Sequence, residues 1–231
     1  MATTGGHTIK AFDDDLDRLR ALISEMGGLA EHNIRESMRC LVERDLDGAK
    51  NVVEEDRKLD SLEIETERRA VQLIALRAPM AGDLRDVVAA LKISGVVERI
   101  GDYAKNIARR VQQLDKAGGK IEPLSLLPEM ARIATQMVHD VLDAFVERDA
   151  EMAVEVCRRD QAVDDFYDSI FRALLTHMME NPHNIGQAAH LLFVAKNIGR
   201  VGDHATNIAE MVFYAATGEH MADKADLGKI R

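Results

Sequence analysis

Apolar residues recur every three or four positions along most of the chain, which is the spacing of one face of an α-helix. The longest of these stripes begins at Leu191 and ends at Val212. Prolines, glycines and short acidic residues interrupt the stripes, as they do at helix ends. The pattern predicts six long helices, over about 8–44, 46–78, 81–116, 125–147, 149–180 and 182–217.

Two stretches of the chain occur twice. Residues 42–45 (VERD) return at 146–149, an offset of 104, and residues 99–108 return at 200–209, an offset of 101. Seven of the ten positions in the longer pair are identical, where chance would give roughly one, so we infer an internal duplication. The predicted fold is all-α: two tandem three-helix bundles over residues 8–118 and 124–217, followed by a polar tail over 218–231.

Composition and charge narrow the classes of function. The 231 residues include 40 acidic and 30 basic side chains, a net charge of −10, which argues against nucleic acid as a main partner. Cys40 and Cys157 lie far apart and suggest no disulfide framework. No apolar run approaches the roughly 20 residues of a membrane span, and the first residues lack the apolar region of a signal peptide. We therefore expect a soluble cytoplasmic protein.

Acidic residues four positions apart recur in both halves. Asp56 and Asp60 share one face of the second predicted helix, and Glu98 and Asp102 share one face of the third. Like charges at this spacing destabilise a bare helix, so their repetition favours a bound cation. The candidate ligands are Asp56, Asp60, Glu98 and Asp102, here called the first-half site, and Asp160, Asp164 and Asp203, the second-half site.

The identity of such a cation, and whether it binds, stay open at this point. Oxygen-only ligation suits Mg, Mn, Ca or ferric iron better than Zn or Cu. A solvated helix face, neutralised locally by Lys58, Arg99 and Arg200, also explains any single acidic pair. Gly101 and Gly202, each directly before an Asp, indicate close approach by either a partner helix or an ion. We recognise no phosphate loop, nucleophile elbow or catalytic acid–base system.

The repeated stretches also resemble a known family. Residues 98–108 (ERIGDYAKNIA) and 202–210 (GDHATNIAE) are similar to the paired signatures of the PhoU family, accessory proteins of phosphate-specific transport in bacteria. Residues 26–28 (MGG), 83–85 (DLR) and 139–145 (HDVLDAF) are also similar to that family. The resemblance spans the chain apart from about its first ten and last dozen residues.

The resemblance implies two tandem three-helix bundles, usually dimeric, and a role that is not enzymatic. That role is repression of the phosphate regulon when phosphate is plentiful, through contacts with the cytoplasmic side of the phosphate ABC transporter and with the phosphate-sensing histidine kinase. Some members hold metal ions or clusters on an acidic-x-x-x-Asp motif. The motif corresponds here to Asp56/Asp60, Glu98/Asp102 and Asp160/Asp164.

One position departs from the family pattern. Gly199 precedes Arg200-Val201-Gly202-Asp203 where the family signature carries Glu. We therefore predict that the first-half site binds divalent metal more strongly than the second-half site. Two other functions remain. One is a carboxylate-bridged di-metal enzyme, although no Glu-x-x-His pair of that class lies in register with these acidic residues. The other is a metal-free helical scaffold.

Overall fold

The structure is a computed structural model that describes residues 4–116 and 125–221, with side chains from residue 12 onward. Within these residues the elements are α1 (Thr4–Glu43), α2 (Leu46–Arg77), α3 (Gly82–Lys116), α4 (Leu127–Glu147), α5 (Ala150–Glu180), a short 3₁₀ turn η2 (Pro182–Asn184) and α6 (Ile185–Thr217). This confirms the all-α prediction and its six long helices. The predicted domain boundary at 118–124, and the tail from 222, lie outside the described residues.

The shorter of the two repeats forms a two-residue turn in each half. Arg44 and Arg148 adopt left-handed backbone angles, φ 63° and φ 58°, and so end α1 and α4. The next residue caps the following helix: the Asp45 carboxylate accepts from the Gly48 amide at 2.9 Å, and Asp149 accepts from the Met152 amide at 2.9 Å. Because the joins are so short, each pair of helices runs antiparallel.

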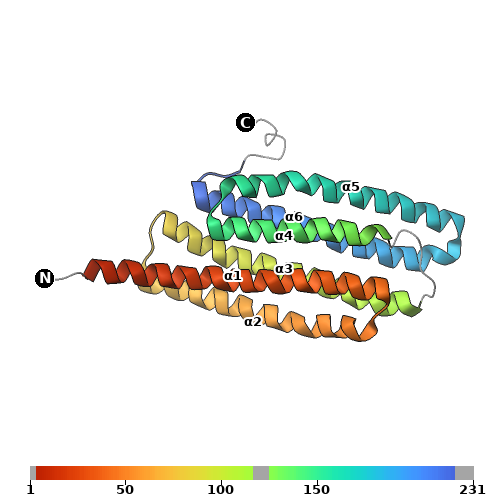
Figure 1. Cartoon of the computed structure of the whole chain (residues 1–231), viewed down its shortest axis with the longest axis horizontal. Coiled ribbons are helices and arrows are strands. Elements are labelled where there is room, and N and C mark those ends of the chain that lie inside the picture. Colours follow the sequence, from red (N-terminus) through yellow and green to blue (C-terminus); the bar gives the residue numbers. More distant parts are fainter. Residues whose placement is uncertain (1–3, 117–124, 222–231) are drawn as a thin grey trace.

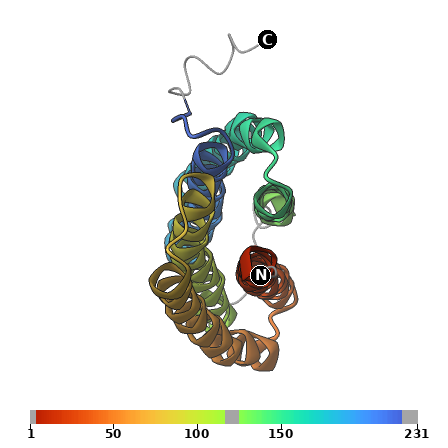
Figure 2. The same ribbon diagram turned by 90° about the vertical axis from the view of Figure 1, so that its left-hand side faces the viewer.

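The six helices form two bundles that pack side by side (Figure 1). Helices α1, α2 and α3 contact one another, as do α4, α5 and α6, and the bundles meet where α3 packs on α6 and α1 on α4. Seen along the long axis, α2 and α5 lie at opposite edges (Figure 2). The predicted apolar stripe of α6 is buried in this core, from Leu191 through Ile198 and Ala205 to Val212.

Two residues that are equivalent in the duplication meet between the bundles. Tyr103 and His204 stack with ring centroids 5.4 Å apart, and the Tyr103 hydroxyl lies 3.1 Å from His204 Nε2. Equivalent residues of two copies contact each other at a two-fold axis. This contact is the one expected if a pseudo-two-fold axis through the α3–α6 interface relates the two halves.

A buried ion group also links the two halves. The Asp86 carboxylate, 3% exposed, lies 3.1 Å from Arg148 Nη1 and 3.4 Å from Arg20 Nη2. Burial raises the pKa of Asp86, while the charges of Arg148 and Arg20 act against this rise. The group joins α3 to α1 and to the turn between α4 and α5, so it helps to set the relative position of the bundles.

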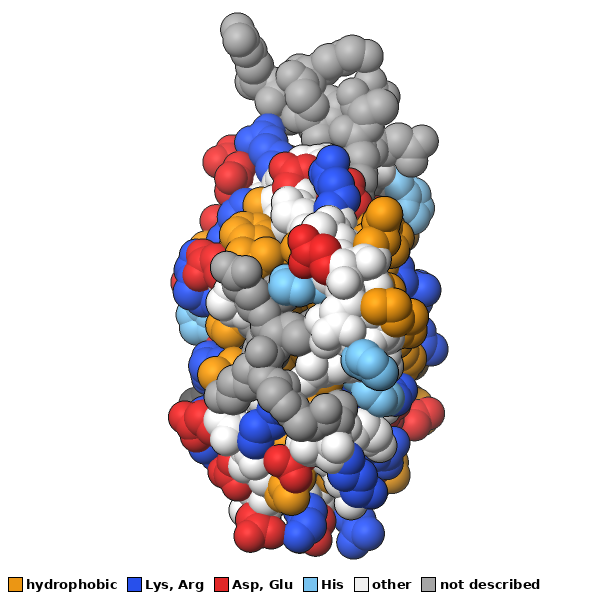
Figure 3. Space-filling model, turned by 90° about the vertical axis from the view of Figure 1, so that its right-hand side faces the viewer, with side chains coloured by type: hydrophobic (Ala, Val, Ile, Leu, Met, Phe, Trp, Pro, Cys, Tyr) orange, Lys and Arg blue, Asp and Glu red, His pale blue; other side chains and the backbone are white. Residues whose placement is uncertain are grey.

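The surface carries charges of both signs. Acidic and basic side chains alternate with apolar ones over the end of the molecule shown in Figure 3. None of the helices in the described part of the chain is long and apolar enough to cross a membrane.

Candidate functional site

The first-half site lies where α2 packs on α3. Asp56 projects from α2 and is buried, whereas Asp102 projects from α3 and is half-buried. The ammonium of Lys105 lies between them, in close contact with Asp56 Oδ2 and Asp102 Oδ1. The structure therefore brings together two of the predicted ligands, with a lysine between their carboxylates.

Glu98 and Asp60 lie near this pair and interact with it through their charges. Burial raises the pKa of Glu98 to about 7, helped by repulsion from Asp102, Glu63 and Asp60. Glu63 has a raised pKa for the same reasons, burial first and then the charges of Glu67 and Asp60. The first-half site is thus an acidic cluster in which the pKa of Glu98 is raised into the neutral range.

Lys105 is the residue of this cluster that sequence reasoning missed. Burial alone would lower its pKa, but hydrogen bonds to Asp102 and Asp56 together raise it, so the ammonium is charged at neutral pH. For Asp56, a carboxylate, burial has the opposite effect: it raises the pKa, while the contact with Lys105 acts to lower it. A signal was present: Lys105 follows Asp102 by three positions and so shares its helix face.

The second-half site differs in two positions. Gly199 takes the place of Glu98, and Thr206 takes the place of Lys105 at the repeat offset of 101. The Thr206 hydroxyl donates to the backbone carbonyl of Asp203 at 2.7 Å. Of the predicted ligands, Asp160 is buried, Asp203 is half-buried and Asp164 is exposed. The second copy therefore lacks both the additional carboxylate and the lysine.

His204 lies beside Asp203 but contributes to the bundle interface. Its ring stacks on Tyr103, and burial lowers its pKa, with a further contribution from Arg99.

Close helix packing explains the two repeated glycines. A Cβ built on Gly101 would overlap Leu59 Cδ1 and would lie 3.4 Å from Asp56 Oδ1. A Cβ on Gly202 would lie 3.0 Å from Asp160 Oδ1 and 3.4 Å from Val163 Cγ1. In both halves the missing side chain lets the neighbouring helix, with its Asp, approach the backbone.

The carboxylates as placed do not fit a metal ion. Across residues 12–116 and 125–221, no three His, Cys, Asp or Glu side chains converge as metal ligands do. In the first-half site the lysine ammonium occupies the space between Asp56 and Asp102. Ligation of Mg, Mn or Fe by the seven predicted residues stays a prediction.

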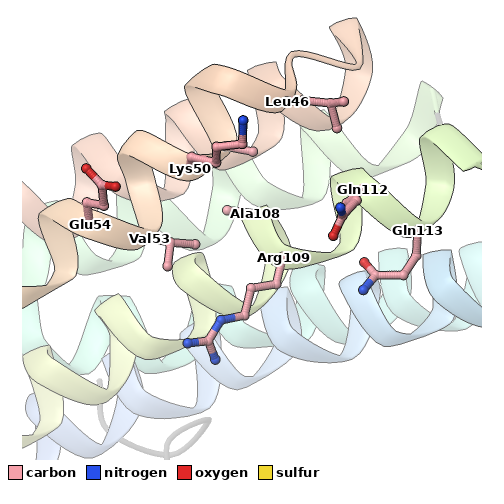
Figure 4. Close-up of a pocket in the computed structure, with 9 residues that line it drawn as sticks. Leu46, Lys50, Val53, Glu54, Ala108, Arg109, Gln112 and Gln113 are labelled. Carbon is pink, nitrogen blue, oxygen red and sulfur yellow. The ribbon is translucent and has the colours of Figure 1, made fainter.

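A groove lies between the start of α2 and the end of α3 (Figure 4). Its volume is about 470 Å³. Apolar and small side chains form its floor, and charged or amide side chains form its rim. We name it the α2–α3 groove. It is lined by Leu46, Ala49, Lys50, Val53, Glu54, Ala108, Arg109, Gln112 and Gln113. The groove is open to solvent along the outer face of the first bundle.

The equivalent position in the second half is covered by the chain itself. The counterpart of Val53 is Cys157, at the offset of 104, which is buried with its Sγ 3.7 Å from Met221 Sδ. The counterpart of Gln113 is Tyr214, whose ring stacks on His220 with centroids 4.7 Å apart. The segment that follows α6 thus packs where the first half has an open groove.

Comparison with known proteins identifies a family with this architecture. The PhoU domain matches residues 23–111 and 127–212. The PhoU homolog of Zymomonas mobilis is 52% identical over 95% of this chain and 92% of its own, and that of Caulobacter vibrioides is 46% identical over 94% of this chain and 95% of its own. Both are described as phosphate-specific transport system accessory proteins.

Solved structures agree with the sequence relatives. The crystal structure of PhoU from Pseudomonas aeruginosa superposes with a TM-score of 0.86 at 34% identity, covering 90% of this chain and 100% of that one. The phosphate transport system regulatory protein PhoU from Streptococcus pneumoniae gives a TM-score of 0.84 at 25% identity, over 91% of this chain and 99% of that one. The resemblance read from the repeated stretches is confirmed, and the chain belongs to the PhoU family.

Proposed function

We propose that this protein is a negative regulator of the phosphate regulon and acts as an adaptor. It contacts the cytoplasmic side of the phosphate ABC transporter and the phosphate-sensing histidine kinase, and it represses uptake and signalling when phosphate is plentiful. The names of its relatives support a role in phosphate transport. A cytoplasmic location, a homodimer and the lack of enzymatic activity are parts of the same proposal.

The α2–α3 groove is the observation that carries the adaptor role. An apolar floor with a charged and amide rim is the anatomy of a protein interface. In the second half Met221 packs against Cys157, the counterpart of Val53. This contact supports the idea that the equivalent position in the first half receives an apolar side chain. In the first half we assign that place to a side chain of a partner protein.

The two other functions have less support. In the described residues the Lys105 ammonium bridges Asp56 and Asp102. This does not favour a carboxylate-bridged di-metal enzyme, because such a site needs open metal positions. A metal-free helical scaffold would account for the fold but leaves the α2–α3 groove without a role.

Deletion of the gene tests the regulatory role. In a strain without this protein, a promoter that responds to phosphate starvation is expected to remain active in phosphate-rich medium, because the repressing contact is missing. Transcript measurements in rich and starved medium check this, and a plasmid copy of the gene should restore repression. Normal repression in the deletion strain would rule out the proposed function.

A further inference from the structure

The first-half site contains a cation supplied by the chain. The Lys105 ammonium contacts Asp56 Oδ2 from α2 and Asp102 Oδ1 from α3. The side chain of Lys105 is 18% exposed and that of Asp56 is 5% exposed, so solvent reaches the contact only partly. A lysine has three N–H donors and one positive charge, which allows it to bind two carboxylates at once.

The backbone geometry places Lys105 in this position. Lys105 lies one helical turn after Asp102, so both side chains project from the same face of α3. Gly101, on the adjoining turn, lets α2 approach so closely that Asp56 Oδ1 lies 3.4 Å from the Cβ position of that glycine. The ammonium of Lys105, a residue of α3, can therefore contact Asp56 on α2 and Asp102 on α3 at the same time.

A divalent ion would need the same oxygens. Asp56 Oδ2 and Asp102 Oδ1 are the carboxylate atoms that the ammonium occupies. An ammonium and a divalent ion that share the same carboxylates would repel each other strongly, because a partly buried site screens charge less than water does. The two cations therefore exclude each other at these two carboxylates.

The duplication provides an internal comparison. At the position of Lys105 the second half has Thr206, whose hydroxyl binds the backbone carbonyl of Asp203. The lysine is thus specific to the first half, which is also the half that keeps the additional carboxylate, Glu98. The additional carboxylate and the lysine therefore occur together in one half and are both absent from the other.

We propose that the Lys105 ammonium replaces a metal ion in the first-half site. It bridges Asp56 and Asp102, holds α2 against α3 and excludes divalent metal from both carboxylates. This reverses the order of affinity predicted from the carboxylates alone, because the half with more carboxylates is the half that is closed to metal.

Calorimetric titration of Mn²⁺ into the full-length protein, from which bound metal has first been removed with a chelator, tests this proposal. Lys105→Gln removes the charge at similar length, and it is expected to create a Mn²⁺ site that binds at least about tenfold more tightly than any Mn²⁺ binding of the wild type. The added site should disappear in the double variant Lys105→Gln/Asp102→Asn. Lys92→Gln, an exposed lysine on the same helix, is the matched control and should behave as wild type.

A second comparison does not depend on the folding of the lysine variant. In the wild-type background, Asp102→Asn is expected to leave Mn²⁺ binding unchanged, because Asp102 binds no metal while Lys105 is present. Loss of a Mn²⁺ site on this substitution would overturn the proposal. A folded Lys105→Gln protein, verified by circular dichroism, that gains no Mn²⁺ binding would overturn it equally.

Discussion

Replacing Gly101 by valine is expected to lower the free energy of unfolding by about 2–3 kcal/mol. A Cβ at this position overlaps Leu59 Cδ1, and Leu59 is fully buried, so it has no solvent space into which to move. The two further carbons of valine add to this overpacking between α2 and α3. Urea denaturation followed by circular dichroism measures the loss, provided the slope of the transition stays unchanged.

Gly28→Val is the matched control for this prediction. Gly28 lies in α1, where a Cβ would meet nothing within 4 Å. Because valine is a better helix former than glycine, this variant should gain a few tenths of a kcal/mol, roughly the difference between their helix propensities. Equal stability of Gly101→Val and the wild type would show that α2 and α3 do not approach as closely as described.

Glu98→Gln is expected to stabilise the protein at alkaline pH and to have little effect on stability near pH 4.5. The folded pKa of Glu98 is raised to about 7 from an ordinary value of 4.5, chiefly by burial. Between these two values the folded state binds more protons than the unfolded state, so stability falls as pH rises through this window. Glutamine cannot ionise, and the variant therefore escapes this loss.

The gain at pH 8 should be about 1 kcal/mol, after allowance for the solvent that screens a partly exposed group. Urea midpoints of both proteins at pH 5, 6.5 and 8, with chelator in every buffer, measure it. Glu25→Gln, an exposed position on α1, serves as the control and should follow the wild type at each pH. A wild-type–variant difference that does not grow between pH 5 and pH 8 would contradict the raised pKa.

The helices and the duplication could be predicted because their signals are local. Apolar spacing within each segment defines a buried face, and the VERD repeat contains both the residue that ends one helix and the Asp that caps the next. The stripe from Leu191 to Val212 is buried as its spacing predicts. In these cases a few neighbouring residues determine the structure, so the sequence pattern suffices.

The role of Lys105 could not be predicted in this way. It depends on the distance between α2 and α3, which Gly101 and Leu59 set by packing rather than by spacing along the chain. The coverage of Cys157 by Met221 is likewise a tertiary event, since the chain must fold back onto α5 after α6 ends. Both features depend on contacts between segments that lie far apart in the sequence, and the spacing of residues within one helix does not encode such contacts.

Co-isolation of the phosphate ABC transporter from membranes of phosphate-fed cells tests the proposed adaptor role most directly. Tagged wild type is compared with Val53→Arg, in the floor of the α2–α3 groove, and with Ile64→Arg, 65% exposed on the same helix but outside the groove. Circular dichroism verifies that both variants fold.

Wild type and Ile64→Arg are expected to capture equal amounts of transporter. Val53→Arg should capture about a tenth or less, because a charge in the floor blocks the inserted apolar side chain, a loss of about 1.4 kcal/mol in binding. Full capture by folded Val53→Arg, or no transporter captured by the wild type, would contradict this account.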